Sequence, residues 1–190
     1  KGVARKYGLA ASFMAKPYAD RPGNGMHLHI SLLDGKGKNV FDDGSDAGSP
    51  VLGHALAGAL AGLADSMLVF APHQNSYRRF AIESHAPMAV CWGYENRTAA
   101  LRVPLGPPSQ RRIEHRVSGA DANPYLVLAA VLGAILTGLE DQKPPPPPIT
   151  SSSYALDLPR LPSSWEDAIN HFTNSAVIAR MLPETLRDML

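Results

Sequence analysis

The chain has 190 residues, 45% of them hydrophobic and 18% charged, which is enough apolar material for a buried core. Its 18 basic residues almost balance 17 acidic ones, and a net charge of +1 excludes a strong overall attraction to nucleic acid or to an anionic membrane. The single cysteine, Cys91, excludes an internal disulfide and a cysteine-ligated metal cluster, and it fits the reducing cytoplasm.

The N-terminal part predicts a short helix, then a strand and a loop. Residues 3–9 are typical of the end of a helix, with Gly8 as its C-cap. In residues 26–33, histidine and serine alternate with leucine and isoleucine, and this period of two predicts a strand. Residues 36–49 are polar and rich in glycine, so we expect a loop there.

Two long helices are expected. Ser49 as N-cap and Pro50 at the first helical position begin a mostly apolar helix over residues 51–70. A second helix begins with Pro124 and runs to about residue 140. Its apolar part, residues 125–139, is shorter than the ~20 residues that a membrane-spanning helix needs, so we expect it to be buried in protein.

Short strands are expected at residues 88–92, 98–103 and 111–117, with a turn at residues 93–97 between the first two. Five prolines at 144–148 predict an extended segment, and short helices are expected at residues 165–172 and 183–190. Strands and helices do not alternate regularly, which favours an α+β fold with a largely antiparallel sheet.

The arginines are concentrated in one part of the chain. Residues 78–116 contain arginine but no lysine, and planar guanidinium groups suit bidentate binding of phosphate or carboxylate. A solvated charged surface is the alternative, but the apolar neighbours of Arg102 and Arg116 favour an anion site.

Two segments offer ligands for a cation. The pleat of a strand places Arg112, Glu114 and Arg116 on one face, which fits either a salt-bridge ladder or a carboxylate that holds a divalent cation beside a bound anion. His27 and His29 also share one strand face. Mg²⁺ or Mn²⁺ takes about six ligands, so His27 and Glu114 would form an incomplete site.

Taken together and in this order, several motifs resemble the catalytic region of the glutamine synthetase family. They are Phe13-Met14-Ala15-Lys16-Pro17, Gly25-Met26-His27-Leu28-His29-Ile30-Ser31, Asn96-Arg97-Thr98 with Arg102-Val103-Pro104, Arg112-Ile113-Glu114-His115-Arg116, and Ala122-Asn123-Pro124-Tyr125-Leu126. The resemblance covers residues 11–128, and the remaining residues fit the helical tail of the family.

The resemblance implies a role for each matching residue. The ligands of a divalent cation, Mg²⁺ or Mn²⁺, would be His27 and Glu114. The ATP-binding residues would be His29, Ser31, Arg97 and Arg112. The glutamate-binding residues would be Gly23, Arg79 and Arg116. The catalytic contacts to the transferred phosphoryl group would be Arg97 and Arg102.

The implied reaction is ATP-dependent ligation of the glutamate γ-carboxylate to an amine, through a γ-glutamyl phosphate intermediate. Members that use ammonium carry a glutamate in a Gly-Tyr-Glu-Ala-Pro stretch, and His85 occupies that position here. The segments at residues 75–80 and 92–98 are similar to the γ-glutamylpolyamine (γ-glutamylputrescine) synthetase branch. We therefore expect an organic amine or a polyamine as substrate, with His85 at the amine site.

Two other functions remain open: a glutamine synthetase that uses ammonium, and a non-catalytic member with a structural or regulatory role. The family implies a curved sheet flanked by helices and a cytoplasmic, ring-forming homo-oligomer with no nucleic-acid or membrane partner. Residues 1–190 would then be a partial catalytic domain, lacking the N-terminal domain, the upstream metal ligands and part of the C-terminal tail. We expect this piece alone to be inactive.

Overall fold

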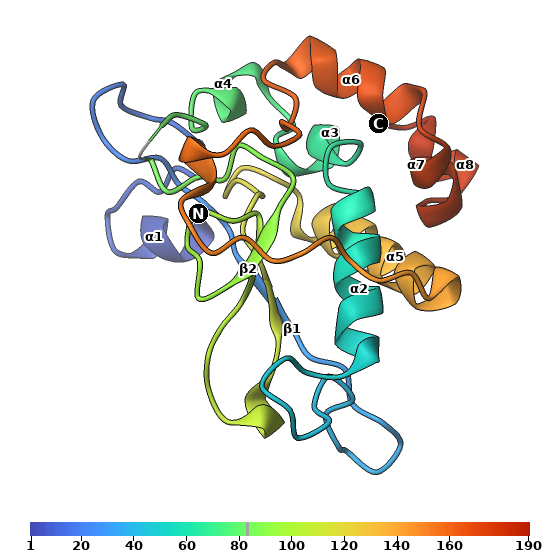
Figure 1. The fold of residues 1–190 in the computed structure, drawn as a ribbon. Coiled ribbons are helices and arrows are strands. Elements are labelled where there is room, and N and C mark those ends of the chain that lie inside the picture. Colours follow the sequence, from blue (N-terminus) through green and yellow to red (C-terminus); the bar gives the residue numbers. More distant parts are fainter. Residues whose placement is uncertain (83) are drawn as a thin grey trace.

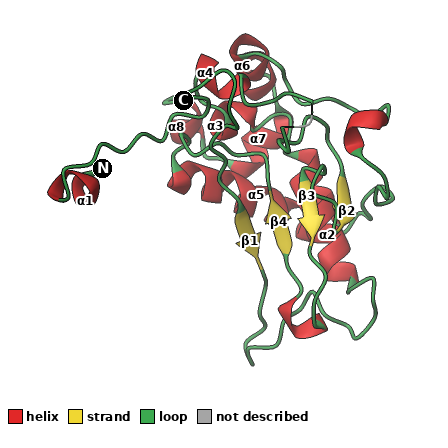
Figure 2. Ribbon diagram, turned by 90° about the vertical axis from the view of Figure 1, so that its left-hand side faces the viewer, coloured by secondary structure: helices red, strands yellow, loops and turns green. Residues whose placement is uncertain are grey.

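The computed structural model describes residues 1–82 and 84–190, and a four-stranded sheet lies at its centre (Figure 1 and Figure 2). The strands follow the spatial order β1-β4-β3-β2, with the bounds β1 (Leu28–Ile30), β2 (Trp92–Tyr94), β3 (Leu101–Val103) and β4 (Ile113–His115). Strand β4 pairs antiparallel with both β1 and β3, whereas β2 runs parallel to β3. The predicted α+β class with a largely antiparallel sheet is confirmed.

The strands are shorter than the alternation predicted. Strand β1 covers three residues of the expected 26–33, and isolated bridges at Gly25 and Leu33 extend the run without a continuous ladder. The strand expected at 88–92 is displaced, because β2 begins at Trp92 and includes Gly93. A Cβ at Gly93 would lie 2.6 Å from the carbonyl oxygen of Ile149, so the segment after the prolines approaches this strand closely.

The first long helix is interrupted. Helix α2 (Pro50–Ala61) begins as predicted, since the Ser49 hydroxyl accepts a hydrogen bond from the Leu52 amide. It ends at Gly62, and a short helix α3 (Met67–Phe70) follows after a turn. The single helix expected over 51–70 is therefore wrong. Glycine is a poor helix former, and Met181 packs within 3.1–3.2 Å of where a Cβ of Gly62 would lie.

The second long helix, α5 (Pro124–Asp141), matches its prediction, and the Asn123 side chain caps it by accepting from the Tyr125 amide. By length and composition alone α5 could cross a membrane, but one of its faces packs along α2. The opposite face is exposed, so the expectation that this helix is buried in protein holds for one face only. The exposed apolar residues are Tyr125, Leu128, Leu132 and Leu136.

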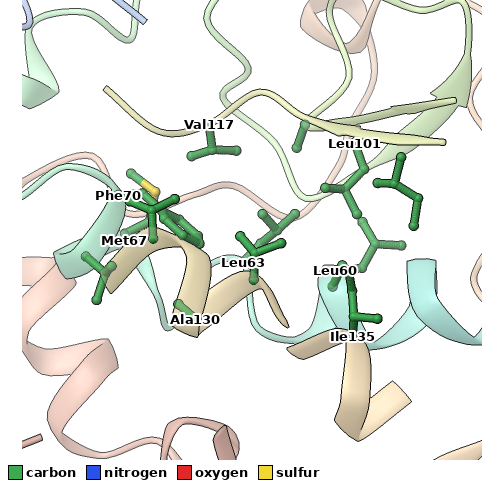
Figure 3. Close-up of a cluster of buried hydrophobic side chains, with 14 of the residues drawn as sticks. Leu60, Leu63, Met67, Phe70, Leu101, Val117, Ala130 and Ile135 are labelled. Atoms are coloured by element: carbon green, nitrogen blue, oxygen red, sulfur yellow. The ribbon is translucent and has the colours of Figure 1, made fainter. Parts of the chain in front are cut away.

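The core lies between one face of the sheet and the helices (Figure 3). Its labelled members are buried. They come from α2 (Leu60), α3 (Met67 and Phe70), α5 (Ala130 and Ile135), β3 (Leu101), the turn after α2 (Leu63) and the segment after β4 (Val117). Each such large side chain contributes roughly 1.5–3 kcal/mol when it leaves water. In β3 the buried Leu101 and Val103 flank the partly exposed Arg102, which leaves the other sheet face for polar groups.

The remaining helices are short. They are α1 (Gly2–Lys6), α4 (Gln74–Tyr77), α6 (Trp165–Thr173), α7 (Ala176–Met181) and α8 (Glu184–Arg187). Gly8 follows α1 with φ +68°, as its predicted cap role requires. Helices α6 and α8 fall within the ranges expected for the tail, give or take a residue, whereas α4 and α7 were not predicted. Short 3₁₀ turns occupy Pro108–Gln110 and Ser153–Ala155.

Candidate active site

The strand register brings Glu114 to the centre of the polar sheet face. In the β1–β4 ladder His29 lies opposite Glu114, and in the β3–β4 ladder Arg102 lies opposite the same residue. Directly opposed residues of neighbouring strands have side chains within contact distance. Pairing of β4 between β1 and β3 therefore assembles a histidine, a glutamate and an arginine from three separate parts of the sequence.

Glu114 is the shared partner of this cluster. Its Oε1 lies 3.0 Å from His27 Nδ1, accepts a hydrogen bond from Arg116 Nη1 at 2.8 Å, and lies 3.9 Å from His29 Nε2. Its Oε2 accepts from Arg102 Nη1 at 2.8 Å. The Glu114 side chain is only 4% exposed, so these groups replace water around its charge.

The surroundings fix the protonation states of the two proposed metal ligands. Burial alone would raise the pKa of Glu114, but the hydrogen bond from Arg102 and the charge of Arg116 outweigh it and keep the pKa below its usual value. The pKa of His27 is lowered, first by burial and then by Arg116, in spite of the nearby carboxylate. A carboxylate beside a neutral imidazole is the form in which both residues bind a metal.

The geometry fits a shared divalent cation. Two neighbouring ligands of an octahedral ion, each at about 2.1 Å, are separated by about 3 Å, and His27 Nδ1 and Glu114 Oε1 lie 3.0 Å apart. Carboxylate oxygen suits Mg²⁺ and Mn²⁺, and first-row metal ions accept imidazole nitrogen. Within residues 1–82 and 84–190 no group of three or more His, Cys, Asp or Glu side chains completes such a site.

Gly23 and Arg79, both assigned to the glutamate site, lie in contact. A Cβ at Gly23 would lie 2.8 Å from Arg79 Cγ, so only glycine leaves room for this arginine. Arg79 is 6% exposed, donates to the carbonyl of Val117, and has its pKa lowered to about 10 by burial. Gly25 approaches both Arg79 and His27, which joins this pair to the Glu114 cluster.

Three of the four residues predicted to bind ATP, His29, Ser31 and Arg112, make contacts at the β1–β4 end of the sheet. Arg112 Nε donates to His29 Nδ1 at 3.1 Å, and Ser31 Oγ donates to the Arg111 carbonyl at 3.0 Å. Arg97 is exposed in the loop between β2 and β3, and no hydrogen bond among the described residues ties it to Glu114. Its role stays a prediction.

His85 is exposed and has a positive φ of 58°, in a loop whose residue 83 lies outside the described part of the chain. The hydroxyl of Tyr154 donates to the Ala86 carbonyl at 2.9 Å and fixes one side of this loop. Placement at the amine site stays a prediction as well.

Sequence reasoning missed two residues of this region. Glu95, in the loop after β2, binds Arg102 Nη2 through its Oε2 at 2.6 Å. His115 is completely buried on the other face of β4 and packs against Phe70, with ring centroids 4.6 Å apart. The alternation that places Glu114 and Arg116 on the polar sheet face turns His115 toward the core, and all three side chains are buried. No pattern in the sequence pairs Glu95 with Arg102.

The family model for the glutamine synthetase catalytic domain matches residues 1–189. The chain belongs to the glutamine synthetase family. It is 41% identical to γ-glutamylputrescine synthetase PuuA of Escherichia coli (strain K12) over 182 residues, which is 96% of this chain and 39% of the relative. It is also 41% identical to γ-glutamylethanolamide synthetase GlnA4 of Streptomyces coelicolor over 177 residues, 93% of this chain and 38% of the relative.

The fold agrees with a solved member of the glutamine synthetase family. GmaS, in a structure without ligand, superposes with a TM-score of 0.86 at 32% identity, covering 98% of this chain and 44% of that one. The resemblance to the family and to its γ-glutamylpolyamine branch is thus confirmed. The chain spans about two fifths of the length of these curated relatives.

Proposed function

We propose that this chain carries part of the active site of an ATP-dependent ligase that joins the γ-carboxylate of glutamate to an amine. The observation that carries the proposal is the contact of Glu114 with His27, Arg102 and Arg116 on one sheet face. One carboxylate, one neutral imidazole and two guanidinium groups suit a reaction in which phosphate and carboxylate charges meet.

The reaction proceeds in two balanced steps. A γ-carboxylate oxygen of glutamate attacks the γ-phosphorus of ATP, and ADP leaves. The amine nitrogen then attacks the γ-carbonyl carbon, phosphate leaves, and the nitrogen loses a proton to a base. A divalent cation held by His27 and Glu114 would offset phosphate charge. Arg102 donates to the transferred phosphoryl group, while Arg79 and Arg116 pair with the glutamate carboxylates.

An organic amine is the proposed nucleophile. His85 stands where ammonium-using members have a glutamate, and an imidazole can accept the amine proton without attracting ammonium by charge. A cavity of about 390 Å³ adjoins the loop that carries His85, and its lining is mostly apolar: Tyr77, Phe80, Ile82, Met88, Tyr154, Leu161 and Pro162. Arg160 also lines this cavity, which favours an uncharged carbon substituent over a second ammonium group.

We further propose that residues 1–190 work as part of a longer chain. Two metal ligands are too few for Mg²⁺ or Mn²⁺, so other segments would supply the rest. The full-length protein would form a ring of identical subunits in the cytoplasm, with glutamate, ATP and the amine as substrates. The isolated domain is expected to release no phosphate.

The proposal is tested by phosphate release from ATP in the full-length protein. Glutamate is supplied with one of ammonium, methylamine, isopropylamine, ethanolamine or putrescine. We expect one of the organic amines to give the highest kcat/KM. Faster turnover of ammonium than of every organic amine would favour an ordinary glutamine synthetase. No phosphate release with any amine, together with no binding of an ATP analogue in the presence of Mg²⁺, would favour a non-catalytic member.

A further inference from the structure

Glu95 contacts the Glu114 cluster but has no part in the function proposed above. Its Oε2 accepts a hydrogen bond from Arg102 Nη2 at 2.6 Å, and its Oε1 accepts one from the Leu105 backbone amide. Both carboxylate oxygens are therefore engaged. Since Glu95 directly follows β2 and Leu105 lies just beyond β3, this one side chain links the ends of two parallel strands.

Arg102 lies between two carboxylates. One terminal nitrogen donates to Glu114 Oε2 at 2.8 Å and the other to Glu95 Oε2 at 2.6 Å. The Arg102 side chain is 14% exposed, and its Nε has no hydrogen-bond partner among the described residues. Two acceptors on opposite terminal nitrogens fix the plane of a guanidinium group, whereas a single acceptor leaves it free to rotate.

The backbone of Glu95 is unusual. Its φ is +50°, in the left-handed region that glycine, asparagine and aspartate adopt more readily than glutamate. The conformation is held by the hydrogen bond from its own amide to the Val103 carbonyl at 3.1 Å and by the two side-chain contacts. A residue kept in an unfavourable conformation by contacts on several sides indicates a constraint on its side chain.

We propose that Glu95 is a positioning residue for Arg102. It holds one terminal nitrogen of the guanidinium group in place. The other terminal nitrogen, which faces Glu114, can then donate to the transferred phosphoryl group while the guanidinium plane keeps its orientation. The inference rests on the proposed function, because Arg102 needs a phosphoryl group to act on.

The first test compares Glu95→Gln and Glu95→Asn with the unmodified full-length enzyme. Glutamine keeps an oxygen for the Leu105 amide but loses the charge that binds Arg102. Asparagine suits the left-handed backbone, so this variant removes the contact while favouring the fold. We expect kcat to fall about tenfold to a hundredfold in both, as for other small misplacements of catalytic groups. KM for glutamate should stay within about twofold, and the unfolding temperature should remain close to that of the unmodified enzyme.

Glu140→Gln is the matched control, since Glu140 is also an exposed glutamate paired with an arginine, Arg180, at 3.4 Å but lies at the end of α5. Its kinetics should not change. Equal loss of kcat in the control and in the two Glu95 variants, or unchanged kcat in the Glu95 variants, would overturn the proposal.

A double-mutant cycle with Arg102→Gln separates positioning from a general structural effect. If Glu95 acts through Arg102, Glu95→Gln has no further effect on kcat once Arg102 is gone. Additive losses would overturn the positioning role while the ligase function stands. Absence of ATP-dependent ligation in the unmodified enzyme would instead overturn the proposed function, and the positioning role with it.

Discussion

His27 Nδ1 lies 3.0 Å from Glu114 Oε1, although the two residues belong to distant parts of the sequence. The antiparallel pairing of β1 with β4 produces this contact, because it places Glu114 opposite His29, two residues beyond His27. The two residues are close enough to contact one ion, and their role as its ligands stays a prediction.

Replacement of either residue should weaken metal binding. In the full-length protein, we expect His27→Ala and Glu114→Gln each to lower the affinity for Mn²⁺ by at least about tenfold, since loss of even a supporting group of a metal site has effects of this size. Titration followed by electron paramagnetic resonance measures the affinity. His54→Gln, on α2, is the control. Unchanged Mn²⁺ affinity in both site variants would show that the pair is a structural hydrogen-bonded pair.

Arg79 should determine glutamate binding, and its neighbour Arg78 provides the comparison. Arg79 is buried beside Gly23, whereas Arg78 is exposed. Loss of a charge-assisted hydrogen bond costs about 1.5–3 kcal/mol, so we expect Arg79→Gln to raise KM for glutamate about tenfold to a hundredfold. Arg78→Gln should leave KM unchanged. Equal effects of the two substitutions on KM would argue against direct contact between Arg79 and glutamate.

His85 should control the choice between ammonium and an organic amine. We expect His85→Glu to raise kcat/KM for ammonium by about tenfold, because a carboxylate attracts ammonium and accepts its proton. His85→Gln removes the imidazole without adding charge, and it should lower the rate with organic amines without a gain for ammonium. Competition between the two amines in the phosphate-release assay measures the ratio. An unchanged ratio in the glutamate variant would place His85 outside the amine site.

Gly58 should be essential for the packing of α2 on α5. A Cβ at this position would contact the Ala134 carbonyl and lie 2.6 Å from the Gly138 Cα. We expect Gly58→Ala to cost about 2–3 kcal/mol, which lowers the unfolding temperature by about 5–10 °C. Gly53, on the same helix, is the control, because the nearest atom to its Cβ would be Pro145 Cδ at 3.4 Å. Gly53→Ala should leave the unfolding temperature unchanged or raise it, and a similar drop in both variants would contradict this account.

His115 should make the domain less stable in acid. Burial, with smaller effects of the charges of His27 and Arg79, lowers the pKa of His115 from 6.5 to about 3. Between these two values the unfolded chain binds the proton and the folded chain does not, so stability falls as the pH is lowered. From pH 7 to pH 5 this amounts to a loss of about 2 kcal/mol.

His115→Leu removes this titration and keeps an apolar contact with Phe70. Urea unfolding at pH 7 and at pH 5 should therefore show a smaller loss in the variant than in the unmodified protein. The same loss in both would mean that other groups account for the acid sensitivity.

Local signals predicted much of the fold. Ser49-Pro50 and Asn123-Pro124 mark the starts of α2 and α5, because a capping side chain and a proline act on the adjacent turn only. The end of the first helix was missed. It breaks at Gly62, where Met181 from α7, far away in the sequence, leaves little room for a side chain.

In the candidate site too, local patterns predicted some contacts but missed those between distant segments. Strand alternation placed Arg112, Glu114 and Arg116 on one face, and the structure joins Arg116 to Glu114 as that pattern allows. The choice between a salt-bridge ladder and a cation site was open in the sequence, because it depends on His27 and Arg102 from other strands. The partnership of Glu95 with Arg102 follows from the parallel pairing of β2 and β3, which no local pattern indicates.

Both oxygens of Glu114 are already occupied, Oε1 by Arg116 and Oε2 by Arg102. A cation that binds this carboxylate competes with these guanidinium groups, and a guanidinium group that is released can bind an anion. If a cation and an anion bind as proposed, they should therefore bind cooperatively, each lowering the dissociation constant of the other by the same factor.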